Sequence, residues 1–299
     1  MAESARPPIS VGVGVAALLA GAMAIATAPL FVKVSEVGPV TTAFWRVTLA
    51  LPALWLWSVL LNPEHGASFA RDRKPMFAAG FYFAGDLAVW HWSIVLTSVA
   101  NSTLLANLAP IFVTFAVWVL YRRRPTGLFV AGLAVALAGM AALLGGDFRL
   151  SGKELAGDAL GVVTAMFYAA YQLTVTQLRS RVPAGTIMAW SSLVMAAILL
   201  PIAFFSEGQL LPHTGTGWLK LVGLALIAHA AGQGLIAYAM AHLPPTFSSV
   251  GLLLQPVTAA ALAWVLLGET LGAIEIAGGV AVLIGIRIAH KAEVGRRST

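Results

Sequence analysis

Two stretches of the chain resemble one another: STLLANLAPIFVTFAVWVLYRRRPTGLFVAGLAVALAG from Ser102 to Gly139, and SSVGLLLQPVTAAALAWVLLGETLGAIEIAGGVAVLIG from Ser248 to Gly285. At a constant offset of 146 residues the matched pairs are Ser102 and Ser248, Pro110 and Pro256, Trp118 and Trp264, Gly132 and Gly278, and Gly139 and Gly285. An apolar composition explains scattered matches of Leu and Ala, but not Pro, Trp and Gly in one register. The pattern therefore predicts an internal duplication.

Composition indicates that the duplicated unit lies in a membrane. Of 299 residues only 10% are charged, and the mean hydropathy is +0.87, well outside the range usual for soluble domains. A helix needs about 20 apolar residues to cross roughly 30 Å of hydrocarbon. Ten runs satisfy this, at about 9–32, 40–61, 75–96, 98–121, 127–146, 156–178, 186–205, 218–241, 245–267 and 270–289.

The duplication and the run count together predict the topology. Two five-helix repeats, 1–150 and 151–299, divide the chain, and because five is odd the second repeat enters the membrane from the other side. We therefore expect an all-α membrane protein of ten transmembrane helices, arranged as two inverted repeats around a central cavity. This arrangement is typical of carriers that work by alternating access.

The basic residues predict the orientation. Thirteen of the 18 Lys and Arg residues lie at the N-terminus, in the even-numbered connections or at the C-terminal end, and four lie on the other side. Cytoplasmic loops are enriched in Lys and Arg, so both termini are expected in the cytoplasm. The net charge of +6 is thus explained by basic loops that orient the protein in the lipid bilayer. No nucleic-acid partner is predicted.

The run 75–96 has a polar stripe at its centre. The stripe consists of Tyr82, Asp86, Trp90, Ser93 and Thr97. Steps of three and four residues place these side chains on one face of a helix. A carboxylate at the bilayer centre costs at least a few kcal/mol unless it faces protein or water, so the stripe is predicted to face inward.

Arg46, six residues into the run 40–61, gives Asp86 two alternative roles. The two side chains can meet across roughly one helical turn of depth, which would make the pair structural. If Asp86 is unpaired, it is a candidate for handling a substrate or a proton. The sequence leaves both alternatives open.

Four other runs have similar polar or aromatic faces, which predicts a shared watery interior. The residues expected to line it are Tyr82, Asp86, Trp90, His91, Asn101, Asn107, Tyr168, Tyr171, Gln172, His229, Gln233, Tyr238 and Gln255. Pro110 and Pro256 lie near mid-membrane and are predicted hinges, because each frees a carbonyl from the helical ladder. The runs 127–146 and 270–289 lack such faces and are predicted to be scaffold.

Structural explanations compete with each of these assignments. Polar side chains often hold membrane helices together by weak hydrogen bonds, and a single interior His is more often satisfied by its neighbours than involved in binding. For Tyr82, Trp90, Tyr168 and Tyr171, cavity lining and simple packing remain equally open.

The chain lacks the motifs of several other classes of protein. It contains no P-loop, no serine-hydrolase elbow, no zinc-protease motif and no cysteine. No paired catalytic constellation is present. No enzyme activity, catalytic residue, cofactor or metal is therefore expected. A channel is disfavoured because the stripes are chemically mixed, whereas pores favour rings of like groups.

The two-repeat plan and three local features resemble the EamA-type carriers of the drug/metabolite transporter superfamily. The segments that carry the resemblance are DLAVWHWSIVLTSVANSTLLANLAPIF from Asp86 to Phe112 and LLLQPVTAAALAWVLLGETLGAIEIAGGVAVLIGI from Leu252 to Ile286. Their most specific features are the mid-helix prolines, the Gly268-Glu269 pair and the Gly278 to Gly285 spacing. The first half has Arg122-Arg123 in place of the Gly-Glu pair.

This resemblance implies export of small metabolites from the cytoplasm through a bacterial inner membrane. The branch that the chain most resembles exports aromatic and other hydrophobic amino acids, which deep Tyr and Trp side chains would bind by stacking. The alternatives are a multidrug or lipophilic-cation efflux carrier, and a non-transporting membrane sensor of the same fold. Ten helices suffice for a carrier that functions as a monomer.

Overall fold

The computed structural model describes residues 11–61, 65–145, 152–268 and 270–297, and all its regular elements in these ranges are helices. They are α1 (Val11–Ile25), α2 (Ala28–Lys33), α3 (Pro39–Thr48), α4 (Leu51–Leu61), α5 (His65–Leu96), α6 (Val99–Ala106), α7 (Ala109–Tyr121), α8 (Gly127–Leu144), α9 (Gly152–Arg179), α10 (Ala184–Glu207), α11 (Gly215–Gly223), the π-helix η1 (Leu224–Gln233), α12 (Gly234–Ala239), α13 (Pro245–Gly251), α14 (Leu254–Leu267) and α15 (Ala273–Arg297). The expected boundary between the two repeats, at 150–151, lies outside the described residues. So does Glu269 of the Gly268-Glu269 motif.

Nine helical stretches of the described chain are long and apolar enough to cross a membrane. They correspond to nine of the ten expected runs. The run 75–96 is the exception; it forms the second part of α5, which kinks at Asp72 and has Pro75 inside it. The all-helical membrane fold is thus confirmed, whereas a tenth span remains a prediction.

Several expected continuous helices are broken in two near their middle. The breaks fall between α1 and α2, α3 and α4, α6 and α7, and α13 and α14. A proline lies in the first three residues after each break: Pro29, Pro52, Pro110 and Pro256. Proline has no N–H to donate and clashes with the carbonyl four residues earlier. Each helix is therefore interrupted just before its proline, which then lies in the first turn of the following segment.

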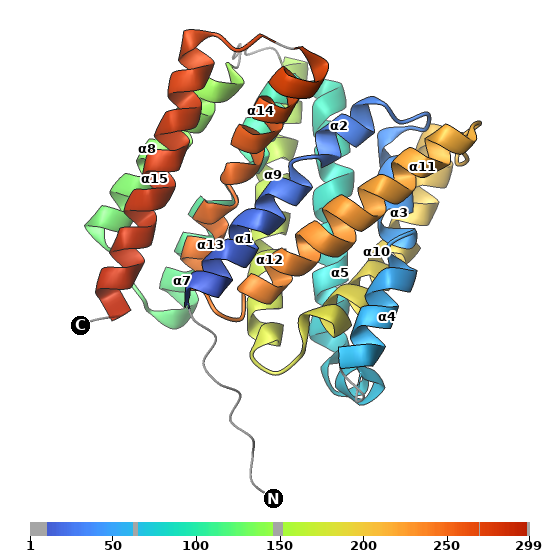
Figure 1. The fold of residues 1–299 in the computed structure, drawn as a ribbon, viewed down its shortest axis with the longest axis horizontal. Helices are drawn as coiled ribbons and strands as arrows, with labels where there is room; N and C mark the ends of the chain where they lie inside the picture. The colour runs from blue at the N-terminus through green and yellow to red at the C-terminus, as the bar shows by residue number, and fades with distance from the viewer. Residues whose placement is uncertain (1–10, 62–64, 146–151, 269, 298–299) are drawn as a thin grey trace, which may run out of the picture.

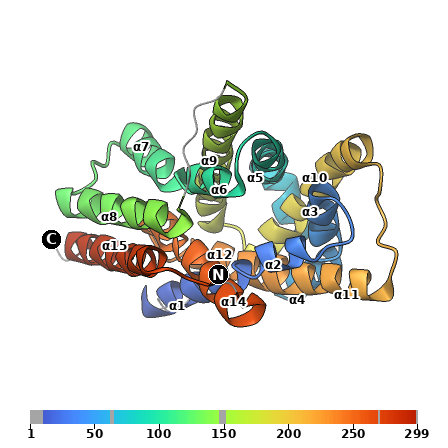
Figure 2. The same cartoon turned by 90° about the horizontal axis from the view of Figure 1, so that it is seen from above.

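α8 and α15 lie side by side along one flank of the bundle (Figures 1 and 2). Their glycines make the close approach. A Cβ atom on Gly139 would lie 2.6 Å from the Gly278 carbonyl oxygen, and one on Gly285 would lie 2.6 Å from the Gly132 carbonyl oxygen. Small residues allow membrane helices to pack backbone to backbone in this way, so these two helices form the expected scaffold.

The two halves of the chain also contact one another in a reciprocal manner. α5 packs along α9, while α1 packs along η1 and α12; α3 packs against α10. Most buried apolar side chains belong to one core that runs through both halves. The halves are therefore interleaved rather than separate.

Two glutamates join the halves at one end of the bundle. Glu207, at the end of α10, accepts hydrogen bonds from the backbone N–H groups of Val40 (2.7 Å) and Thr41 (2.8 Å) at the start of α3. Glu36 accepts from the backbone N–H groups of His213 and Thr214, just before α11. Carboxylates at helix N-termini are stabilised by unpaired N–H groups and the helix dipole. We call the opposite end, where α1 begins and α15 ends, the terminal face; it is the lower end in Figure 1.

Candidate functional site

A central cavity of about 180 Å³ lies where the interrupted helices meet α5 and α9. Its lining residues are Ile25, Arg46, Phe83, Asp86, Leu87, Trp90, Thr103, Ala106, Asn107, Thr164, Tyr168, Gln233 and Gln255. They come from α1, α3, α5, α6, α9, η1 and α14, except Asn107, which directly follows α6. The cavity thus draws on both halves of the chain.

Six residues that the sequence suggested lie together around this cavity. They are Asp86, Trp90, Asn107, Tyr168, Gln233 and Gln255. Asn107 follows the last residue of α6, where its amide donates to the Thr103 carbonyl at 2.8 Å. Gln255 comes one residue before Pro256. Two of the helix breaks therefore bring amide side chains to the cavity wall.

The other seven suggested residues lie outside the lining. They are Tyr82, His91, Asn101, Tyr171, Gln172, His229 and Tyr238. The Nδ1 atom of His91 lies 2.8 Å from the Leu87 carbonyl oxygen, and the Nε2 atom of His229 lies 2.8 Å from the Ser192 hydroxyl. Tyr82 packs near Phe81 and Phe167, and the Tyr238 ring meets His242 edge-on at 5.1 Å. Asn101 and Gln172 are buried.

Tyr171 supports the cavity from behind. The Gln233 amide donates to the Tyr171 hydroxyl at 3.0 Å, and that hydroxyl lies 3.7 Å from the Met188 sulfur. The Tyr171 ring stacks on Phe83 with centroids 4.6 Å apart. Tyr171 therefore orients two lining side chains without reaching the cavity itself.

Arg46 is the main lining residue that the sequence did not assign to the cavity. It lies on α3, only 9% of its surface is exposed, and its Nε atom is buried without a hydrogen-bond partner. Among the described residues, no hydrogen bond or ion pair within 4.0 Å joins Arg46 to Asp86 or to any other side chain. A guanidinium and a carboxylate thus face one small space unpaired.

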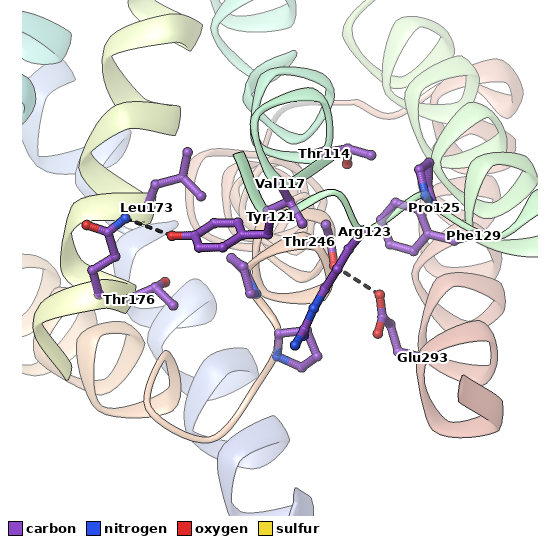
Figure 3. A pocket seen from close by; sticks show the side chains of 13 residues that line it. Thr114, Val117, Tyr121, Arg123, Pro125, Phe129, Leu173, Thr176, Thr246 and Glu293 are labelled. Atoms are coloured by element: carbon purple, nitrogen blue, oxygen red, sulfur yellow. Dashed lines mark hydrogen bonds between the residues drawn. The ribbon is translucent and has the colours of Figure 1, made fainter. Parts of the chain in front are cut away.

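A second, larger pocket, whose lining side chains are drawn in Figure 3, lies near the terminal face, beside the ends of α7 and α9 and the last turns of α15. It has a volume of about 570 Å³ and is lined by α7, α8, α9, α13 and α15. The exposed Tyr121 and Arg123 lie at its wall, where the Tyr121 hydroxyl accepts from Gln177 at 2.7 Å. Thr246 donates to Glu293 at 2.9 Å across the same pocket. The pocket therefore has both polar groups and surface-exposed residues.

A small apolar cluster has members in the walls of both the terminal-face pocket and the central cavity. Its buried members are Ala109, Val113, Val117, Ala165 and Ala169, with Leu108, Phe112, Tyr168 and Leu173 packed against them. Tyr168 also lines the central cavity, whereas Val117 and Leu173 line the terminal-face pocket. The two spaces share no lining residue, and this cluster, called the inner cluster below, includes residues that line each of them.

Within the described ranges, no three His, Asp or Glu side chains gather as metal ligands. The central cavity instead offers hydrogen-bonding amides, aromatic rings, a guanidinium and a carboxyl group. The fold and this cavity together define a multi-pass helical membrane protein with an internal site of mixed chemistry.

Comparison with known proteins identifies the family. Residues 12–145 and 155–289 each match the EamA-like transporter family, and the chain belongs to that family. It is therefore a membrane transporter of the EamA type, as the quoted motifs predicted.

Named relatives include exporters of several metabolites. A probable terminal-alkyne amino-acid exporter of Streptantibioticus cattleyicolor is 29% identical over 69% of both chains. The pseudopaline exporter CntI of Pseudomonas aeruginosa is 24% identical over 75% of this chain and 78% of its own. A probable amino-acid metabolite efflux pump of Salmonella typhimurium is 28% identical over 53% of this chain and 56% of its own.

One solved structure, described only as a crystal structure of a protein, shares the fold. It superposes with a TM-score of 0.82 at 19% identity, covering 94% of this chain and 98% of the other.

Proposed function

We propose that the protein exports aromatic and other hydrophobic amino acids from the cytoplasm of a bacterium through its inner membrane. The observation that carries this proposal is the central cavity, where Trp90, Tyr168 and Phe83 lie beside amides and charged groups. Aromatic side chains favour stacked or edge-on contact with another ring. Two of the relatives are named as amino-acid exporters or efflux pumps, which supports the same substrate class.

Cavity size favours an amino acid over a drug-sized compound. Pockets for drug-sized ligands typically measure about 300–1,000 Å³, whereas this one measures about 180 Å³. The unpaired Arg46 guanidinium also disfavours a lipophilic cation. Efflux of such cations is thus the weaker alternative.

The proposed topology is ten spans in two inverted repeats, with both termini in the cytoplasm. The two family matches and the glycine contacts between α8 and α15 support it. Gly132 meets Gly285 while Gly139 meets Gly278. The internal alignment relates Gly132 to Gly278 and Gly139 to Gly285, so the repeat exchanges one contact for the other. A two-fold axis produces such reciprocal contacts.

In this topology the terminal-face pocket is the cytoplasmic access route. Substrate would pass from it to the central cavity when the inner cluster separates. The helix breaks before Pro110 and Pro256 are the proposed hinges, because α7 and α14 can tilt there without breaking a regular hydrogen bond. The reciprocal Glu36 and Glu207 contacts would hold the opposite face closed meanwhile. A single chain supplies every element of this cycle, so we propose a functional monomer.

Counterflow in reconstituted vesicles tests the proposal. Vesicles loaded with unlabelled phenylalanine, methionine or tryptophan should accumulate the same labelled amino acid transiently and saturably. A lipophilic cation measured in the same vesicles separates the drug-efflux alternative. A non-transporting sensor would bind amino acids without any counterflow, and that result would overturn the proposed export function.

A further inference from the structure

We propose that Arg46 and Asp86 form a two-point site for a zwitterion, with Arg46 binding its carboxylate and Asp86 its ammonium group. This inference rests on the proposed amino-acid transport and adds the part of the substrate that is recognised. It assigns to Arg46 a binding role in place of a purely structural pairing with Asp86.

The first argument is that, within the described part of the chain, neither of the two side chains has a hydrogen-bond or ion-pair partner. Leaving a charged group buried without a partner costs several kcal/mol. Arg46 is 9% exposed and its Nε atom has no partner, yet Asp86 on the same cavity wall is not within 4.0 Å of it among the described contacts. The cavity therefore holds a guanidinium and a carboxyl group that make no contact with one another, and a ligand between them can bind both.

The second argument is the selectivity that this arrangement creates. A ligand with only a carboxylate can pair with Arg46 but leaves Asp86 unpaired, and an amine does the reverse. Sites built around polar partners reject analogues that lack the matching group, because their own buried groups are then left unsatisfied. Only a zwitterion pairs with both side chains.

The third argument is the remainder of the lining. Leu87, Ile25 and the aromatic rings supply an apolar surface for a side chain, while Asn107 and Gln255 supply neutral hydrogen-bonding groups. Arg is suited to a carboxylate because its planar fork can bind both oxygens. Different residues of the cavity would thus bind the amino-acid head group and accommodate its side chain.

Three compounds with the same ring test the inference in the wild-type protein. They are L-phenylalanine, 2-phenylethylamine, which lacks the carboxylate, and 3-phenylpropanoate, which lacks the ammonium group. Each is added as a competitor during counterflow of labelled phenylalanine. We expect both single-charge analogues to inhibit at least about tenfold more weakly than phenylalanine, as loss of one buried charge-assisted contact implies.

Two variants then assign each charge to its group. In Arg46→Gln the advantage of phenylalanine over 2-phenylethylamine should shrink, because the carboxylate has lost its partner. In Asp86→Asn the advantage over 3-phenylpropanoate should shrink instead. Asp158→Asn is the matched control, since Asp158 hydrogen bonds to Thr97 at 2.8 Å outside the cavity; both ratios should stay at their wild-type values.

The outcomes distinguish this inference from the proposed function. If wild-type protein shows no counterflow of any amino acid, the proposed function fails and the zwitterion site fails with it. If counterflow occurs but the three compounds compete equally, only the zwitterion site is overturned. The same holds if each variant weakens all three compounds by one factor. The wild-type comparison decides the matter even if a variant fails to fold.

Discussion

Tyr168 lies at the junction of the central cavity and the inner cluster, so its ring contacts both. It lines the cavity, packs against the inner cluster and lies nearly parallel to Tyr171, with centroids 6.1 Å apart. A bound aromatic side chain would meet a ring that its neighbours already hold in place. Such pre-organisation lowers the entropy cost of binding.

Replacing this ring should weaken binding of aromatic substrates. An aromatic contact is worth about 0.5–1.5 kcal/mol beyond the buried area, so Tyr168→Leu should raise KM for phenylalanine roughly two- to tenfold. Tyr82→Leu is the control, because Tyr82 is also half-buried but lies outside the cavity lining. Concentration-dependent counterflow measures both. Equal KM values in the two variants would remove Tyr168 from the site.

The polar stripe of α5 shows how far residue spacing can predict a site. The spacing placed Asp86 and Trp90 on one face, and both line the cavity. Farther along, Ser93 donates to the Gly157 carbonyl at 2.7 Å and Thr97 to Asp158 at 2.8 Å. The same face of α5 therefore lines the cavity at the centre of the helix and packs against α9 near the end of the helix. Spacing alone cannot tell where α9 covers the stripe.

At the scale of elements, the packing of α8 on α15 depends on adjacent glycines that differ in their surroundings. A Cβ atom on Gly278 would lie 2.5 Å from the Leu143 backbone nitrogen, which cannot move aside. A Cβ atom on Gly279 would meet its nearest atom, on Val257, at 3.6 Å. That is an ordinary contact distance.

Gly278→Ala should therefore destabilise the protein, whereas Gly279→Ala should not. Overpacking of this kind typically costs about 1–3 kcal/mol, while the control should stay within about 0.5 kcal/mol. Thermal unfolding of the two purified variants in detergent gives the comparison. A Gly278→Ala protein that unfolds at the wild-type temperature would show that the helices can separate at no cost.

Asp72 connects the kink of α5 to the segment between α9 and α10. Its carboxylate accepts from Arg181 at 2.7 Å and from Arg71 at 3.0 Å. Burial raises the pKa of Asp72, but the two hydrogen bonds and positive charges outweigh burial and hold that pKa below its ordinary value.

This balance makes the contribution of Asp72 depend on pH. Because the folded-state pKa is lowered, the stabilisation is complete above the ordinary value of about 3.9 and is lost as pH falls through the folded-state pKa. Asp72→Asn should lower the unfolding temperature at pH 7, by an amount corresponding to about 1 kcal/mol or less. The deficit should shrink below pH 4. A constant deficit from pH 7 to pH 3 would contradict the assignment.

Proline breaks were only partly predictable from the sequence. The matched positions of Pro110 and Pro256 drew attention to them, but Pro29 and Pro52 interrupt α1–α2 and α3–α4 in the same way. These two breaks could have been predicted, because a proline in a helix interior kinks or breaks the helix. The π-helix η1 had no comparable signal, because its residues Leu224–Gln233 form an ordinary apolar helical pattern. In the structure η1 packs against α1 and α3.

At the scale of the whole molecule, two glutamates link segments that are distant in the sequence. Glu36 of the first half reaches the start of α11, and Glu207 of the second half reaches the start of α3. Both contacts lie away from the terminal-face pocket. The glutamate contacts and the terminal-face pocket thus lie at opposite faces, as the proposed transport cycle requires.

Sequence reasoning predicted this architecture better than the details of the cavity. Hydropathy and the internal repeat depend on many residues, so they predicted the helical membrane fold and the scaffold role of α8 and α15. The partners of individual polar groups depend on side-chain packing. For that reason His229, bonded to Ser192 of α10, could not be distinguished from Gln233, which lines the cavity.

The central claim is a cavity reached in turn from each side of the membrane, and cysteine accessibility tests it most directly. The chain has no native cysteine, so Ala106→Cys on the cavity wall can be labelled alone, with the fully buried Ala136→Cys as the control. During counterflow, residue 106 should react with a membrane-impermeant thiol reagent applied from either side, and phenylalanine should slow the reaction. Residue 136 should not react. A protein that transports while residue 106 stays closed to reagent from one side or both would contradict the alternating cavity.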